Sequence, residues 1–515
     1  MNHTLTRRRF AGALAAGAAL PAAPPRPNIL FIMVDEMRWD AMSCEKHPVV
    51  ETPNLDRLAA QGVRFARAYT VSPVCSPARA SAFTGRYAHV HGVVNNGVPA
   101  HAGEIFLPSI LKHYGYHTAI SGKLHYAPRQ FSFGFDRFWS FSSEGPTPET
   151  GYNEYLRRKY GSPAKWPIVE GTCPWPDDAL GRDVGLFKYP IADFETEWIT
   201  DRSVDYLRAR KASDQPWFLF TSYLKPHSPS VEPEPYFSKY DRANIPMPKL
   251  PANAREMRAK QTGQSRRHYV DDERMVRVIS SKYYGAINHV DDQVGRLLGE
   301  LDRLGMADNT LVLFTADHGN MLGDRGRWFK GIQYEGSARV PLLWRGPHSA
   351  AENGGRVVDH VVENVDLLPS ILETAGLPIP EGAQGASFVN LARGKDPRWK
   401  NRCFSQLRSG MLLEGDYKLI DNSLDGSGED IELYDLRNDP KEERNLARDP
   451  RQRERAAAFR KRIAEWRAER PAPLRVPGMA TPDYARIAGN ERENAAGAQT
   501  GRRKRRDARA GGRLK

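Results

Sequence analysis

Four short apolar runs recur along the chain, and each ends abruptly in polar or charged residues. They are Asn28–Val34, Thr118–Ile120, Phe218–Phe220 and Leu311–Phe314. Uninterrupted apolar runs predict parallel strands that are buried on both faces of a sheet. Ligands bind outside the carboxyl ends of such strands, so the polar residues that follow the four runs should meet in one crevice.

Helical patterns separate these runs. Met275–Leu304 keeps apolar residues at helical spacing, and Thr52-Pro53 is a typical helix start, with a capping hydroxyl and proline at the first position. Alternating strands and helices predict an α/β fold in which a large, mainly parallel sheet is sandwiched by helices. We expect this catalytic domain to occupy residues 27–385.

The pattern changes after about residue 385. Residues 412–420 and 432–436 predict antiparallel strands and turns, and an amphipathic helix is expected near Arg455–Arg467. We therefore expect a smaller C-terminal α+β subdomain with an antiparallel sheet over residues 386–475. The charged, proline-containing residues 240–275 are expected to form a loop.

The formal net charge of +13 comes largely from the two ends of the chain. Residues 501–515 hold eight Lys and Arg against one Asp, and Arg7–Arg9 add three more charges. The remaining body is close to neutral, which does not favour nucleic acid as its partner. Residues 490–515 have the composition of a disordered basic tail.

Residues 1–23 have the three regions of a signal peptide. Arg7–Arg9 are followed by an Ala-rich apolar stretch over residues 11–20 and by small residues. The apolar stretch is too short to span a bilayer, so no stable membrane insertion is expected. Paired arginines before Phe10 resemble a twin-arginine signal. We expect the twin-arginine machinery to export the protein to the periplasm or the extracellular space.

The chain has four cysteines, too few for a disulfide scaffold of this length. Cys75 stands out because it precedes a strong helix pattern. Ser76 can cap a helix whose first position is Pro77, and Gly85 can end it. Cys75 would then lie at a positive helix end, with Arg79 about one turn along. These features allow either a reactive thiolate or a buried structural cysteine. If Cys75 is reserved for chemistry, at most one disulfide is expected.

The residues Cys75-Ser76-Pro77-Ala78-Arg79, followed by Thr84-Gly85, resemble the signature of the formylglycine-dependent (type I) sulfatases of the alkaline phosphatase superfamily. The resemblance runs from Pro27 to about Asn445. It passes through Asp35, Gly122-Lys123-Leu124-His125, Lys225-Pro226-His227, Asp317-His318-Gly319, Trp328, Lys330, Leu433-Tyr434-Asp435-Leu436 and Asp439-Pro440. It implies an alkaline phosphatase-like fold. It also implies a formylglycine-generating or sulfatase-maturing enzyme that oxidises Cys75 to formylglycine (3-oxoalanine).

The resemblance implies one metal ion, and calcium is expected because Asp35 and Asp317 offer hard oxygen ligands. Magnesium or manganese is the lesser possibility. His318 joins these ligands in the similar sulfatases. Glu36 stands where the family often has a second aspartate or an amide, and it is expected as the fourth ligand.

The resemblance also implies the catalytic roles. Arg79 and Lys123 match residues that hold the aldehyde hydrate, whose hydroxyl attacks sulfur and expels the alcohol. His125 matches the base that then releases sulfate by removing a proton from the second hydroxyl. His227 and Lys330 match residues that bind the sulfate and protonate the leaving group.

The expected activity is that of an arylsulfatase-type sulfuric ester hydrolase acting on a sulfated small molecule or carbohydrate. The stretch Glu335–Pro341 resembles that of choline sulfatases and is similar to that of bacterial carbohydrate sulfatases. A phosphonate monoester or phosphodiester hydrolase of the same superfamily is the alternative. A weaker alternative is a protein that binds polyanions, such as nucleic acid or sulfated polysaccharide, through the basic tail.

Overall fold

The computed structural model describes residues 26–489, except residues 142–143, 147–149, 162–166, 171, 173–183, 261–268, 348–353, 396–397 and 424–429. The expected signal peptide, the basic tail and Cys173 lie outside the described residues. Cys44, Cys75 and Cys403 are free. Among the helices that the structure describes, none combines the length and apolar character needed to cross a membrane.

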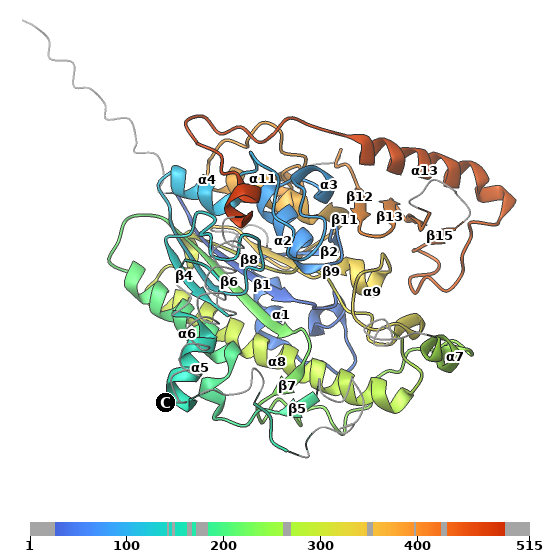
Figure 1. Ribbon diagram of the computed structural model, residues 1–515, viewed down its shortest axis with the longest axis horizontal. Coiled ribbons are helices and arrows are strands. Elements are labelled where there is room, and N and C mark those ends of the chain that lie inside the picture. Colours follow the sequence, from blue (N-terminus) through green and yellow to red (C-terminus); the bar gives the residue numbers. More distant parts are fainter. Residues whose placement is uncertain are drawn as a thin grey trace, which may run out of the picture.

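A large sheet forms the centre of the molecule (Figure 1). Its strands follow the order β11 (Arg356–Glu363), β2 (Val63–Tyr69), β10 (Leu342–Arg345), β8 (Thr310–Ala316), β1 (Asn28–Asp35), β6 (Trp217–Pro226), β3 (His117–Gly122) and β4 (Arg137–Ser140), and β9 (Arg339–Val340) pairs with β2. β1 runs parallel to β6 and β8, and β3 runs parallel to β6 and β4. β10 is antiparallel to β2 and β8. The predicted, mainly parallel sheet is confirmed.

The four apolar runs form the neighbouring strands β8, β1, β6 and β3. In β1 every residue from Ile29 onward is buried, as are all residues of β6 and β8. Val34 pairs with Ala316 on one side and with Tyr223 on the other. Because the strands are in register and parallel, their carboxyl ends open at one edge of the sheet.

Helices cover both faces of the sheet (Figure 1). α1 (Pro53–Gln61), α6 (Glu195–Arg210) and α8 (Glu273–Leu304) pack together on one face, and α2 (Cys75–Thr84), α4 (Leu107–His113) and α11 (Leu367–Thr374) pack on the other. The remaining elements of the body are α3 (Ala88–His91), α5 (Tyr152–Tyr160), α7 (Ala254–Ala259), α9 (Glu335–Ala338), α12 (Val389–Ala392) and the two-stranded sheet of β5 (Val184–Leu186) and β7 (Ser230–Glu232). The predicted helix over Met275–Leu304 is confirmed. The predicted loop over residues 240–275 contains α7.

A second, four-stranded antiparallel sheet follows, as predicted. It consists of β12 (Arg402–Gln406), β13 (Gly410–Glu414), β14 (Tyr417–Asp421) and β15 (Ile431–Asp435), and α13 (Arg453–Ala468) comes after it. Leu412, Leu419 and Leu433 on one face pack against α13. Leu413 and Tyr434 on the other face pack with Tyr69 and Ala338 of the large domain. The boundary at residue 385 stays a prediction.

Candidate active site

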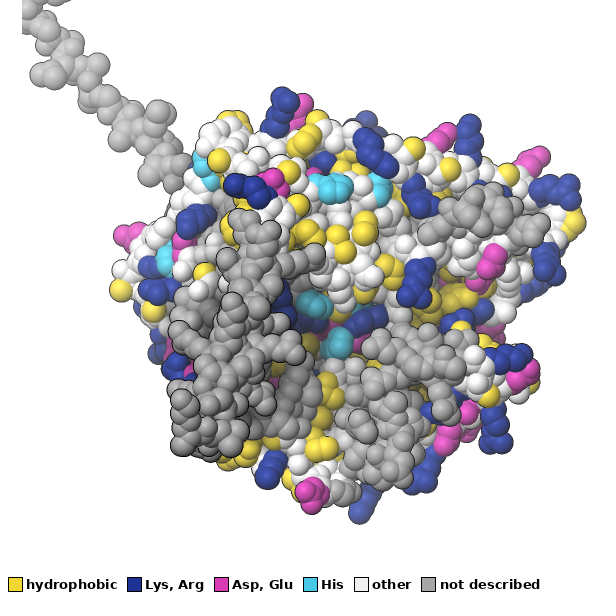
Figure 2. Space-filling model, in the orientation of Figure 1, with side chains coloured by type: hydrophobic (Ala, Val, Ile, Leu, Met, Phe, Trp, Pro, Cys, Tyr) yellow, Lys and Arg dark blue, Asp and Glu magenta, His cyan; other side chains and the backbone are white. Residues whose placement is uncertain are grey.

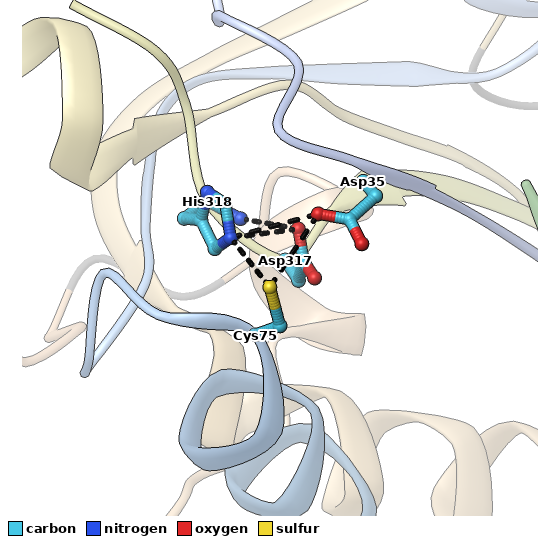
Figure 3. A group of neighbouring side chains, drawn as sticks. All are labelled: Asp35, Cys75, Asp317 and His318. Atoms are coloured by element: carbon cyan, nitrogen blue, oxygen red, sulfur yellow. Dashed lines mark hydrogen bonds and ion pairs between the residues drawn. The ribbon is translucent and has the colours of Figure 1, made fainter. Parts of the chain in front are cut away.

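Four buried side chains converge at the carboxyl edge of the large sheet (Figure 3). Asp35 ends β1, Asp317 and His318 follow β8, and Cys75 is the first residue of α2. Cys75 Sγ lies 3.2 Å from His318 Nε2 and 3.6 Å from Asp35 Oδ1. His318 Nε2 lies 3.6 Å from an oxygen of each aspartate. The predicted convergence of the polar residues that follow the strands is therefore confirmed.

This cluster offers two carboxylates and one imidazole nitrogen to a cation. His318 Nδ1 donates to the Gly319 carbonyl oxygen at 3.0 Å, which leaves Nε2 facing the aspartates. Burial would lower the pKa of His318, but the charges of Asp317 and Cys75 raise it to about 9. The local field therefore favours positive charge, and the donor set fits a divalent metal.

Gly319 holds this turn close to α9. A Cβ atom at residue 319 would lie 2.1 Å from the Gly336 carbonyl oxygen, which is too close for any side chain. The backbone contact fixes the direction in which the preceding residues, Asp317 and His318, leave the end of β8.

Glu36 has different partners from the first cluster. Its Oε1 accepts a hydrogen bond from Asn320 Nδ2 at 2.7 Å, and its Oε2 accepts one from Lys330 Nζ at 2.9 Å. His227 Nε2 lies 3.3 Å from the same Oε2. Glu36 thus groups with Asp35 and His227 as a second set of possible ligands that shares Asp35 with the first.

The backbone of Glu36 is left-handed, with φ at 69°. This conformation is uncommon for a residue other than glycine and is often found where function requires it. Its N–H donates to Asp317 Oδ1 at 3.1 Å, and its carbonyl oxygen accepts from the Tyr283 hydroxyl at 2.7 Å. The first bond holds the end of β1 against the end of β8, and the second joins it to α8.

Basic groups close the other side of the site. Arg79 Nε donates to Asp317 Oδ2 at 2.8 Å, and Arg79 Nη1 donates to Ser222 Oγ at 2.8 Å. Lys123 forms an ion pair with Asp35. Burial opposes the charge on Asp35 and Cys75 raises its pKa, yet Lys123 and the other nearby cations hold it well below its usual range.

The Cys75 thiol lies in this positive surrounding. Burial raises its pKa, but Lys123, Lys330 and His318 together hold the pKa well below the ordinary value. Lys330 Nζ lies 3.5 Å from Sγ. Of the two interpretations of Cys75, the reactive one fits this environment.

The predicted cap of α2 is wrong. The helix begins at Cys75 after Val74, two residues before the expected first position at Pro77. Ser76 lies inside the helix, and its N–H donates to Asn96 Oδ1 at 2.9 Å, so a distant side chain takes the capping role. Gly85 ends the helix in a left-handed conformation, as predicted.

His125 joins the site from the segment after β3. Ser76 Oγ donates to its carbonyl oxygen at 2.6 Å, and its N–H donates to Glu144 Oε2 at 3.0 Å. Its φ is 68°, again left-handed. Its Nδ1 is buried and has no hydrogen-bond partner among the described residues.

The structure thus brings together all ten predicted site residues, which are Asp35, Glu36, Cys75, Arg79, Lys123, His125, His227, Asp317, His318 and Lys330. It adds Asn320, Ser222, Asn96 and Glu144, which the sequence did not indicate. Of these four residues, only Asn320 could have been found from the sequence, since it directly follows the Asp317-His318-Gly319 motif. Figure 2 shows a hollow near the centre of one face, with histidine and basic side chains at its floor.

Comparison with known proteins decides the family. Residues 27–377 match the family model described as Sulfatase. The chain belongs to the sulfatase family. Residues 323–469 of this sulfatase also match the model described as N-sulphoglucosamine sulphohydrolase, C-terminal, which spans the four-stranded sheet.

This sulfatase is similar to other proteins over most of its length. It is 32% identical to an arylsulfatase of Clostridium perfringens, with 85% of this chain and 93% of that protein covered. It is 30% identical to a choline-sulfatase of Rhizobium meliloti, with 86% and 88% covered. Its fold matches the phosphonate monoester hydrolase of Agrobacterium radiobacter with a TM-score of 0.73 and 25% identity, over 86% and 96% of the two chains. The predicted family, enzyme class and alkaline phosphatase-like fold are confirmed.

Proposed function

We propose that this sulfatase hydrolyses sulfate monoesters with formylglycine, made from Cys75, and one calcium ion. The observation that carries the proposal is the position of Cys75 Sγ, within 3.6 Å of both His318 and Asp35 at a helix N-terminus. A nucleophile placed beside a cation site and basic groups suits an anionic ester.

We assign the metal to Asp35, Asp317 and His318, with Glu36 as a more peripheral fourth ligand. When bound, the ion supplies positive charge that lowers the cost of forming an oxyanion nucleophile at residue 75 and neutralises the sulfate. The Arg79 guanidinium fixes Asp317 through its bond at 2.8 Å. Arg79 and Lys123 also hold the hydrated side chain of residue 75.

The remaining residues act on the ester and the protons. Lys330 and His227 lie together at Glu36 Oε2, where their N–H groups can bind sulfate oxygens and donate a proton to the leaving oxygen. His125 is the base that removes a proton from residue 75 when sulfate leaves, since its ring nitrogen Nδ1 has no hydrogen-bond partner among the described residues.

The substrate is proposed to be a sulfated small molecule or carbohydrate. Similar proteins include an arylsulfatase, a choline-sulfatase and an N-acetylglucosamine-6-O-sulfatase. The second candidate is a phosphonate monoester or phosphodiester. It is favoured by the match to a phosphonate monoester hydrolase and by the 29% identity to a multifunctional alkaline phosphatase superfamily protein of Trinickia caryophylli.

The test is hydrolysis of a panel of nitrophenyl sulfate, phosphate and phosphonate esters. The protein is co-produced with a formylglycine-generating enzyme, and conversion of Cys75 is checked by mass spectrometry. We expect the sulfate to be cleaved fastest, with turnover lost in Cys75→Ala. Faster cleavage of the phosphonate would support the second candidate instead.

We also propose that a maturing enzyme acts on Cys75 before export and that residues 1–23 direct export through the twin-arginine machinery. Support comes from the arginine, apolar and small-residue regions of this segment. Replacing Arg8 and Arg9 by Lys should retain the protein in the cytoplasm, whereas unchanged export would contradict the proposal.

A further inference from the structure

The segment Arg325–Glu335 carries Lys330 and contacts the C-terminal sheet at both of its ends. At the first end, Arg325 Nη1 donates to the Glu442 carbonyl oxygen. The Arg325 guanidinium also lies 4.4 Å from the ring centre of Tyr334 and 5.7 Å from that of Tyr434. One side chain therefore joins the start of the segment to its end and to β15.

At the second end, three contacts reach the same part of the chain. The Tyr334 hydroxyl donates to Glu432 Oε2 at 2.8 Å. The Glu335 N–H donates to Glu442 Oε2 at 2.8 Å. Lys418 Nζ donates to Glu335 Oε1 at 3.0 Å and pairs with Glu442 Oε1 at 2.7 Å.

Lys418 places a positive charge between the two carboxylates of this junction. It projects from β14 on the face that packs against the large domain, where its register neighbours are Leu413 and Tyr434. Lys418, Glu335 and Glu442 are all buried. Two buried carboxylates without a cation between them would cost free energy. Arg339 pairs with the other oxygen of Glu335, Oε2, at 3.4 Å, so it does not take the place of Lys418 between the two carboxylates.

Lys330 lies between the two held ends. The next residue, Gly331, donates its N–H to the Pro73 carbonyl oxygen at 3.0 Å, two residues before Cys75. Lys330 Nζ then reaches both Glu36 and Cys75. The position of its ammonium group therefore depends on contacts made on both sides of the segment.

We propose that the C-terminal sheet positions Lys330 for catalysis and that Lys418 is the positioning residue through which it does so. The inference rests on the proposed function, because it takes Lys330 as the group that assists the departing alcohol. A displaced Lys330 harms poor leaving groups most, since these need a proton as the S–O bond breaks.

The test compares 4-nitrophenyl sulfate, which has a good leaving group, with phenyl sulfate, which has a poor one, in fully modified Lys418→Met protein. We expect kcat for phenyl sulfate to fall about 10- to 100-fold, kcat for 4-nitrophenyl sulfate to fall much less, and KM to change little. The double variant Lys418→Met/Glu442→Gln removes one of the two stranded carboxylates and should recover part of the loss.

Arg462→Met is the matched control. Arg462 belongs to α13 and pairs with Glu414 at the surface of the same subdomain. This variant should keep the wild-type ratio of the two rates. If Lys418→Met does not fold, Tyr334→Phe removes only the hydroxyl that bonds to Glu432, and a smaller change of the rate ratio in the same direction is expected.

An equal fall of both rates, or an unchanged ratio in folded Lys418→Met and Tyr334→Phe, would overturn the inference. Failure of the proposed function has a different signature, because modified wild-type protein would then cleave neither sulfate. The wild-type measurement therefore separates the two.

Discussion

Lys330 Nζ lies 2.9 Å from Glu36 Oε2, and this ion pair joins the loop after β8 to the residue that follows β1. Glu36 is buried, whereas the Lys330 side chain keeps 17% of its surface exposed. The pair therefore places a cation at the boundary between the metal ligands and the open side of the site.

Replacement of Lys330 by Met should reduce kcat for phenyl sulfate by about 100-fold or more, because leaving-group assistance would be lost. Steady-state rates on phenyl and 4-nitrophenyl sulfate give the measurement. Lys461→Met, on the exposed side of α13, is the matched lysine control and should be neutral. An equal fall of kcat on both esters would mean that Lys330 does not protonate the leaving group.

Calcium binding should depend more on Asp317 than on Glu36. Asp317 lies in the first cluster with Asp35 and His318, whereas Glu36 belongs to the second set, in which Lys330 pairs with its Oε2 at 2.9 Å. In titration calorimetry, Glu36→Gln should weaken calcium binding about tenfold, and Asp317→Asn should weaken it further. Equal losses of calcium affinity in the two variants would mean that Glu36 is as important a ligand as Asp317.

Arg79 should be essential for stability as well as for activity. It is buried and bonds to Asp317, Ser222 and the Lys123 carbonyl oxygen. Arg79→Met would leave buried carboxylates without their partner, so the free energy of unfolding should fall by about 3–5 kcal/mol. Denaturant unfolding measures this loss, and the surface variant Arg462→Met should stay within about 0.5 kcal/mol of wild type.

Acid should destabilise the protein through His91. Burial, together with the charges of Arg86, His101 and His89, lowers the pKa of His91 from its ordinary value of 6.5 to about 3. The unfolded state then binds the proton and the folded state does not, so stability is lost as the pH falls from 6.5 towards 3.

The His91 contribution is roughly 1.4 kcal/mol per pH unit within that window. Denaturant unfolding at a series of pH values should therefore show a shallower acid limb in His91→Gln than in wild type. Parallel acid limbs would mean that His91 does not titrate in this window.

The sequence predicted the strands at the centre of the sheet and the acids at their ends because both features are local. A buried parallel strand is an apolar run, and Asp35 and Asp317 each follow one closely. The order of the strands, and the insertion of antiparallel β10 between β8 and β2, depend on pairings between distant segments that no local pattern records.

The difference between local patterns and distant contacts also explains the wrong prediction of the helix cap and the site residues that the sequence did not indicate. Ser76 satisfies the local rule for a helix cap, but Asn96 performs that task from 20 residues away. Ser222 and Glu144 are single polar residues without periodicity, and they acquire meaning only through their contacts with Arg79 and His125. Sequence spacing could not reveal them.

The hydrogen bond from the Glu36 backbone to Asp317 joins residues 281 positions apart. β1 therefore gains its neighbour β8, and the first cluster gains two of its four members, only after most of the large domain has been synthesised. Closing so long a loop costs entropy before any contact repays it, which makes assembly of the site a late event in folding. A nascent chain that ends before β8 carries Cys75 and Asp35 without Asp317 and His318, the other two members of the cluster.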